Sequence, residues 1–378
     1  MYREHLPHTD PGPLENFDSD EKFPVPARDP DADITYYGMP AVKHSHYHWK
    51  TALSFFAEAL GGGPQIIATL ISRFGDRKDC HLVRGGRYLA LAGSFLSPAL
   101  LISELHMPRR WFNMLRIFRP TSAMSIGNMS LTLFGVFSGL TAIGQILEDL
   151  GRKKAGQLLG RIFSVPAAAA GGMICLYPGT ELEETCTPLW ADSHPLLSPL
   201  FAATGLSTGA AALTIVSGYM DVSDQGRDRL NTFAALALGV QLGGAVLVDR
   251  SWRCKAGAQS YPGSRYSFLF RFGVIGLGIV LPLALRLPQA VTGKKMPGNA
   301  LAASTATLAG SYLLYETVLE AGNDSAEEPQ VYLEHTRPGK KEQGRGAAVA
   351  GLRKAILSLL TAAGMAYFLL NRRKTGEY

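Results

Sequence analysis

Closely spaced cysteines are absent from this sequence. Its four cysteines, Cys80, Cys175, Cys186 and Cys254, lie far apart, and no two of them form a C-x-x-C pair. Iron–sulfur clusters and structural zinc ions are commonly held by such closely spaced thiolates. We therefore predict that the cysteines of this chain hold neither an iron–sulfur cluster nor a zinc ion.

Histidines are missing from the middle of the long apolar runs described below. A haem held between membrane helices needs axial histidines inside those helices, so we predict no haem. Three alternate histidines, His44, His46 and His48, precede the first run. They leave three possibilities open: a metal site, a solvated loop, or one histidine that bonds a ligand.

Charged residues are few, at 18% of the chain, whereas hydrophobic residues make up 47%. The sequence contains apolar runs near twenty residues, the length that crosses the core of a bilayer. Eight of them occupy residues 49–72, 88–105, 125–147, 162–179, 198–220, 230–248, 268–287 and 299–320. We predict an all-α, polytopic membrane protein, with eight transmembrane helices in two four-helix sets. A ninth run at 347–370 either crosses the membrane or lies on its surface.

Two further patterns are missing. Basic residues do not alternate with aromatic residues, so the net charge of +6 indicates loop topology and anionic lipid, and no nucleic-acid binding is predicted. The first residues do not form a basic region followed by an apolar core, so no cleaved signal is evident.

Basic residues in the loops indicate the orientation of the chain. Lys and Arg are modestly more numerous in the loops on one side of the predicted helices than on the other. The loop after the fourth run gives the clearest signal, because Glu181, Glu183, Glu184 and Asp192 occur there without a basic residue. We predict that this loop and the N-terminus lie outside.

A polar cluster ends the second apolar run. Glu104, His106, Arg109 and Arg110 follow directly on residues that would cross a membrane. Ionisable groups close to lipid usually pair with one another or line a cavity. We predict a polar pocket around Glu104 and His106; the alternative for the two arginines is a stop signal at the level of the lipid headgroups.

Carboxylates also occur within or beside other runs. Glu58 lies about nine residues inside the first run, so it is either functional, for example in a proton path, or satisfied by a neighbouring helix. Glu148, Asp149 and Asp249 lie near predicted helix ends, where we expect solvation among headgroups.

A long and specific motif surrounds the polar cluster. It comprises Leu100, Leu101, Ile102, Glu104, Leu105, Pro108, Arg110, Trp111, Asn113, Met114, Leu115, Arg116, Phe118, Arg119, Pro120, Ser122, Met124, Ser125 and Gly127. With this motif the sequence resembles the NrfD/PsrC type of integral membrane subunit, the quinone-reactive anchor of polysulfide-reductase-like complexes. The resemblance covers roughly residues 36–322. Two departures occur: Glu104 stands where the family usually has Asp, and Gly127 ends a Met-Ser-Ile-Gly-Asn stretch in place of a more usual Gly-Ser or Gly-Trp ending.

The resemblance implies a quinone site. Tyr177, in a Tyr-Pro-Gly motif followed by Thr187-Pro-Leu-Trp190, matches the family's tyrosine at the quinone headgroup. Without the resemblance, Tyr177 would be read as an interfacial anchor. We expect Tyr177, His44, His48, Trp49 and Arg109 to contact menaquinone or ubiquinone. Glu104 and His106 would exchange protons with the outer side.

The resemblance also implies partners. The chain would be a subunit of a multi-subunit oxidoreductase rather than a stand-alone enzyme, passing electrons between quinone and a ferredoxin-like iron–sulfur subunit. That subunit would serve a molybdopterin oxidoreductase or a multihaem cytochrome. The acidic loop 181–192 and the linker 107–121 are the expected docking surfaces. The alternatives are a purely structural anchor without a quinone site, and a proton or small-molecule transporter.

These observations divide the chain into four parts. Residues 1–35 are polar and proline-rich and are predicted to be a disordered tail. Residues 36–322 form the predicted transmembrane domain, 323–346 a polar linker, and 347–378 an apolar helix with a basic tail. We expect a multi-pass protein of the inner (cytoplasmic) membrane.

Overall fold

The computed structural model describes residues 45–105, 107–116, 118–254, 261–292 and 297–327. The predicted tail at 1–35 and the ninth apolar run at 347–370 lie outside the described residues. So do two predicted site residues, His44 and His106, and most of the predicted linker.

The described residues form helices and no strand, which confirms the all-α prediction. Each of the eight predicted runs overlaps one long helical segment, and only the runs 88–105 and 198–220 continue past the ends of their helices. The segments are α1 (Trp49–Phe74), α2 (Cys80–Glu104), α4 (Ala123–Asp149), α5 (Lys153–Glu183), α7 (Leu197–Ser217), α8 (Asp224–Cys254), a continuous segment of α9 (Arg265–Phe268), a π-helix (Leu269–Val280) and α10 (Leu281–Thr292), and α11 (Pro297–Glu327). Short helices α3 (Asn113–Arg116) and α6 (Pro188–Asp192) lie in connections.

Several helices extend beyond the predicted runs. Helices α5 and α8 have 31 residues each, which corresponds to about 46 Å at the α-helical rise. That length matches a bilayer with its headgroup regions rather than the hydrocarbon core alone. The apolar runs therefore marked the central parts of these helices, and backbone hydrogen bonding continues into the polar flanks.

Five helical segments are long and apolar enough to cross a membrane: α4, α5, α7, α8 and residues 265–289. Among the described helices, α1, α2 and α11 are also long but more polar, since they carry glycine, serine, threonine and charged residues. The chain is thus a multi-pass membrane protein by its helices. The count of eight crossings stays a prediction for the three more polar helices.

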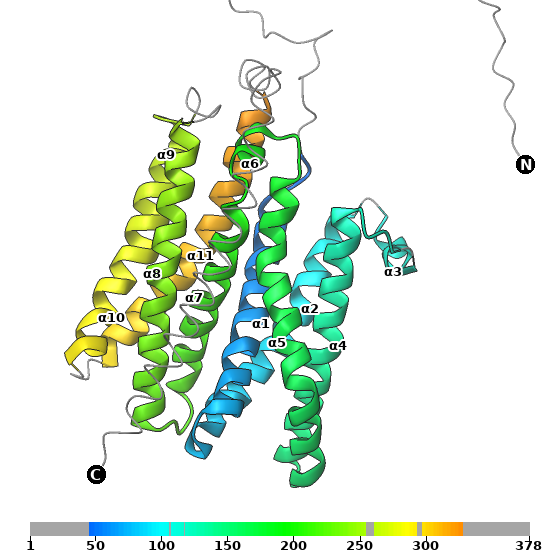
Figure 1. The fold of residues 1–378 in the computed structure, drawn as a ribbon, viewed down its shortest axis with the longest axis vertical. Helices are drawn as coiled ribbons and strands as arrows, with labels where there is room; N and C mark the ends of the chain where they lie inside the picture. The colour runs from blue at the N-terminus through cyan, green and yellow to red at the C-terminus, as the bar shows by residue number, and fades with distance from the viewer. Residues whose placement is uncertain (1–44, 106, 117, 255–260, 293–296, 328–378) are drawn as a thin grey trace, which may run out of the picture. The chain divides into compact units, whose positions relative to one another are not determined.

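The long helices pack as two neighbouring groups within residues 40–378 (Figure 1). The first set comprises α1, α2, α4 and α5, and the second comprises α7, α8, α9–α10 and α11. Helix α1 joins the sets because it also packs against α7 and α11. Successive helices alternate in direction, so α1 begins at the same end of the bundle at which α2 ends, α4 begins and α5 ends (Figure 1).

Three consecutive glycines explain the central place of α1. A Cβ atom added to Gly61 would press on α2 and α4, one on Gly62 would meet Gly171 of α5, and one on Gly63 would meet Gly205 of α7. Each glycine thus faces a different neighbour, and small residues let helices approach closely in membranes. The glycine run therefore sets the spacing between the two sets.

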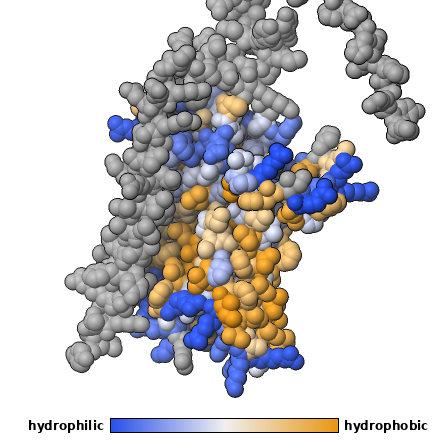
Figure 2. Space-filling model, turned by 45° about the vertical axis from the view of Figure 1, so that its right-hand side comes forward, coloured by the Kyte–Doolittle hydropathy of each residue, from blue (hydrophilic) through white to orange (hydrophobic). Residues whose placement is uncertain are grey.

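The outer surface of the first set is apolar at mid-height. Large hydrophobic side chains are exposed on α4 and α5, namely Leu133, Val136, Ile143, Ile146, Leu158, Ile162, Val165 and Met173. Figure 2 shows this apolar region (orange) between polar residues (blue) at both ends of the drawn face. A contiguous exposed apolar surface flanked by polar ends suits contact with lipid.

Candidate functional site

A cavity of about 1060 Å³ lies at one end of the first helix set. Its walls come from the start of α1, the end of α2, the start of α4 and the end of α5, with further residues from the connection to α6. Because the four helices alternate in direction, residues far apart in the sequence meet there.

Helical periodicity directs the lining residues of α1 and α5 into the cavity. In α1, Thr51, Phe55 and Glu58 recur at spacings of four and three residues, which places them on one face. In α5, Tyr177 and Glu181 lie one turn apart on the lining face. The cavity thus receives two carboxylates and a phenol from these two helices.

Two carboxylates of the lining are held by hydroxyl groups. Thr51 Oγ1 donates a hydrogen bond of 2.6 Å to Glu104 Oε2 at the end of α2. Deeper in α1, Glu58 is buried and accepts a hydrogen bond of 2.9 Å from Ser97 Oγ. Hydrogen bonds to hydroxyls partly offset the desolvation of buried carboxyl groups. Glu58 is therefore satisfied by a neighbouring helix while it also lines the cavity.

Two tyrosines of the lining differ in their partners. Tyr47 donates a hydrogen bond of 3.0 Å to Glu181 Oε1. Burial, reinforced by the charge of Glu181, raises the pKa of Tyr47 well above its ordinary value. The ring of Tyr177 packs against Gly127, where a Cβ atom would collide with it.

The hydroxyl of Tyr177 is buried and has no hydrogen-bond partner among the described residues. The backbone of Gly127 is close, but it does not reach hydrogen-bonding geometry. A buried, unpaired hydroxyl is unfavourable, so native structures usually satisfy it. Here it can donate to, or accept from, a ligand in the cavity.

The structure brings four of the seven predicted site residues into one lining: Glu104, His48, Trp49 and Tyr177. Arg109 is exposed in a 3₁₀-helix at Pro108–Arg110 and is not among the lining residues. Of the three alternate histidines, His46 and His48 both line the cavity. Within the described ranges no group of three or more His, Cys, Asp or Glu side chains could hold a metal ion.

Sequence reasoning missed the pair formed by Tyr47 and Glu181, and it missed Thr51. Glu181 was assigned to an exterior loop, whereas α5 continues through Glu183. The spacing of one turn from Tyr177 was the signal that could have placed Glu181 in the lining. Thr51 carried no such signal, because a threonine near the start of a helix is common.

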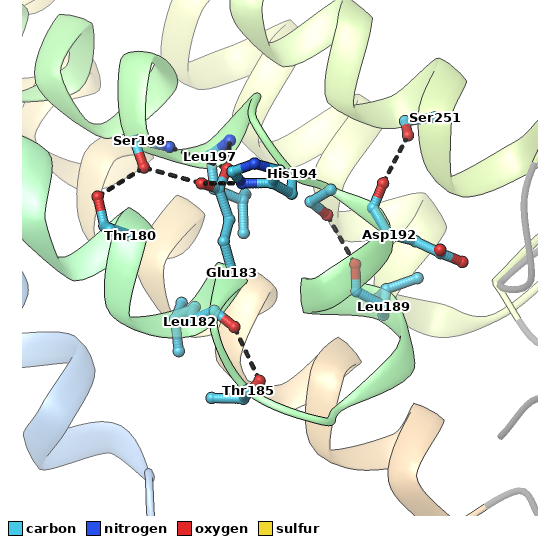
Figure 3. Close-up of polar contacts among 11 residues, drawn as sticks. Thr180, Leu182, Glu183, Thr185, Leu189, Asp192, His194, Leu197, Ser198 and Ser251 are labelled. Atoms are coloured by element: carbon cyan, nitrogen blue, oxygen red, sulfur yellow. Dashed lines mark hydrogen bonds and ion pairs between the residues drawn. The ribbon is translucent and has the colours of Figure 1, made fainter. Parts of the chain in front are cut away.

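The acidic connection is less exposed than its composition suggested. Glu183 is buried at the end of α5, where its Oε1 accepts hydrogen bonds from the backbone N–H groups of Leu197 at 2.7 Å and Ser198 at 3.4 Å (Figure 3). Its Oε2 accepts from Ser198 Oγ at 3.0 Å and lies 3.3 Å from His194 Nδ1. A carboxylate at a helix N-terminus is favourable because it pairs with unsatisfied N–H groups. Glu183 therefore fixes α7 to α5 and is not free to dock a partner.

The described residues form several helices that are long and apolar enough to cross a membrane, and a cavity lined by carboxylates and tyrosines lies among four of the long helices. These features define the class as a multi-pass membrane protein with a cavity inside its helix bundle. Residues 34–327 match the NrfD-type profile described as polysulfide reductase, and the chain belongs to this family. No curated protein matches the chain significantly. The family implies a membrane subunit of redox complexes.

Proposed function

We propose that this chain is the quinone-reactive membrane subunit of a multi-subunit oxidoreductase. It exchanges electrons between menaquinone or ubiquinone and a ferredoxin-like iron–sulfur subunit, which serves a molybdopterin oxidoreductase or a multihaem cytochrome. The cavity lies on the outer side of the inner (cytoplasmic) membrane, with the N-terminus outside and eight helices crossing. The family match and the cavity of the first helix set support this proposal.

The observation that carries the proposal is the shared cavity of Tyr177 and Glu104. These residues come from α5 and α2, and one supplies a buried unpaired hydroxyl while the other supplies a carboxylate. A quinone presents two carbonyl oxygens that accept hydrogen bonds. Tyr177 donates to one of them, and His48 is the lining donor for the other.

A quinol bound in this cavity supplies two electrons and releases two protons when it is oxidised. Glu104 is the first proton acceptor, because its carboxylate lies in the lining and Thr51 orients it. Trp49, next to Lys50 at the start of α1, closes part of the cavity on the aqueous side. We expect no cluster or haem site among the scattered cysteines and histidines of the sequence, so in this proposal the electrons pass to the partner subunit.

The test is the Tyr177→Phe variant in the assembled complex, which removes the hydroxyl and keeps the ring against Gly127. Loss of one hydrogen bond to the reacting substrate lowers quinol-dependent turnover by about tenfold or more. Turnover driven by an artificial donor that reduces the iron–sulfur subunit directly stays unchanged. Tyr219→Phe is the matched control, since Tyr219 is 90% exposed beyond the far end of α7.

The same measurements separate the alternatives. Unchanged quinol turnover in Tyr177→Phe, with an intact complex, would favour a purely structural anchor. Proton movement across proteoliposomes without any quinone would favour a transporter.

A further inference from the structure

The connection between α2 and α4 carries positive charge and exposed apolar side chains together. Residues 107–121 contain four arginines, Arg109, Arg110, Arg116 and Arg119, and no Asp or Glu. All four are exposed, and none forms an ion pair with a described residue. We call residues 107–116 and 118–121 the arginine-rich segment.

Large apolar side chains of the same segment are also exposed. Met107, Phe112 and Phe118 have exposed fractions of 58%, 56% and 52%, and Trp111 and Leu115 are 41% exposed. Figure 1 shows the segment around α3 standing out sideways from the bundle at the cavity end. Aromatic and arginine side chains that occur together suit the boundary between lipid tails and headgroups.

We propose that the arginine-rich segment docks on the surface of the membrane and binds anionic phospholipid headgroups. Its arginines pair with the phosphates, and its aromatic side chains enter the boundary of the acyl chains. Charge complementarity selects this occupant, because the segment has four positive charges and no negative one. A protein partner, which the sequence analysis expected to dock on the linker 107–121, becomes an outcome of the test.

Docking would also hold one wall of the cavity. Met114 of α3 lies in the cavity lining and accepts a hydrogen bond of 3.6 Å at its Sδ from Asn128 Nδ2 of α4. The backbone N–H of Arg119 donates to Ser125 Oγ at 2.9 Å, which ties the end of the segment to α4. The lipid-bound segment therefore keeps Met114 in place beside the quinone, a consequence that rests on the function proposed above.

The test uses the complete complex in nanodiscs whose lipids carry brominated acyl chains, with phosphatidylcholine alone or with added phosphatidylglycerol. The difference in emission between the wild type and Trp111→Phe reports Trp111. We expect bromine to quench Trp111, and the quenching to rise with phosphatidylglycerol and fall with salt. The double variant R116Q/R119Q needs several-fold more phosphatidylglycerol for the same quenching. The matched control K153Q/K154Q, which removes two exposed charges from the start of α5, leaves it unchanged.

The proposal is overturned if Trp111 is not quenched, if neutral and anionic lipids quench it equally, or if the iron–sulfur subunit shields it from bromine. The last result would assign the segment to the protein partner. A higher KM for quinol with unchanged kcat in R116Q/R119Q supports the inference that docking keeps Met114 in place, and an unchanged KM contradicts it. The quenching measurement does not require turnover, so it tests lipid binding independently of the proposed function. If the quinone proposal is wrong, quinol oxidation will be absent in the wild type and in every variant.

Discussion

The two helix sets differ in what some of their polar side chains face. In the first set, Glu104, Tyr177 and Glu58 face a common cavity, and the hydroxyl of Tyr177 has no described partner. In the second set, named polar groups bond to one another across helices. Gln241 of α8 bridges Thr204 and Ser207 of α7 at 3.1 and 2.7 Å, and Arg286 of α10 donates to Asn231 and Ser304 at 3.1 and 2.6 Å.

The ends of the two sets show the same contrast. At the end of α8, Asp249 accepts hydrogen bonds from Arg271 Nε at 3.0 Å and from Tyr261 at 3.1 Å, and it also pairs with Arg253. Polar groups that satisfy each other stabilise a packed bundle, whereas polar groups turned to a cavity remain available for chemistry. The first set therefore holds the cavity on which the proposed function rests, and the polar groups named here in the second set bond to one another.

The largest effect is expected from a substitution that forces the two helix sets apart where α1 packs closely against α7. In Gly63→Ala the new Cβ atom meets the backbone of α7, so the helices must move apart. We expect a loss of stability of about 3 kcal/mol, at the upper end for overpacking. Thermal unfolding in detergent measures it. Gly139→Ala in α4, where no atom lies within 4 Å of an added Cβ, serves as control and should unfold like the wild type.

A second prediction compares one carboxylate from each set. Asp249→Asn leaves the guanidinium groups of Arg253 and Arg271 without their anion, and we expect it to destabilise the protein by about 2–3 kcal/mol. Glu104→Gln keeps a hydrogen-bonding side chain in the cavity, so its stability should change by less than about 1 kcal/mol while quinol turnover falls. The contrast fails if unfolding temperatures shift equally or if Asp249→Asn selectively abolishes turnover.

The smallest effect concerns Tyr261 at high pH. Burial, followed by the nearby charge of Asp249, raises the pKa of Tyr261 in the folded protein. Below the ordinary tyrosine pKa near 10 both states keep the proton, and above it the unfolded state loses its proton first, so stability falls as the pH rises. Tyr261→Phe should be about 1 kcal/mol less stable at pH 8 and lose less stability between pH 9 and 11. The same dependence of unfolding free energy on pH in the variant and the wild type would refute this prediction.

The sequence was sufficient for the helices and for much of the site. Apolar runs located all eight long helical segments, because length and apolarity are direct requirements of the bilayer. The motif around Tyr177 pointed to a residue that lines the cavity.

The failures have a common cause. Asp249 was expected to be solvated among headgroups, but it is 4% exposed and paired with arginines. Glu181 and Glu183 were expected in an outer loop, but α5 continues and turns them toward Tyr47 and the start of α7. The sequence indicates how far a charged residue lies from the end of an apolar run. The side chain's partners depend on neighbouring helices, whose positions are set only in the folded protein.

The glycine contacts of α1 restrict how the molecule can change shape. Sliding or tilting α1 would displace its four tightly fitted neighbours together, so Thr51, Phe55 and Glu58 form a stationary side of the cavity. A change of shape that widens the cavity must then come from the opposite side, beside Met114, where the polypeptide leaves the helical bundle.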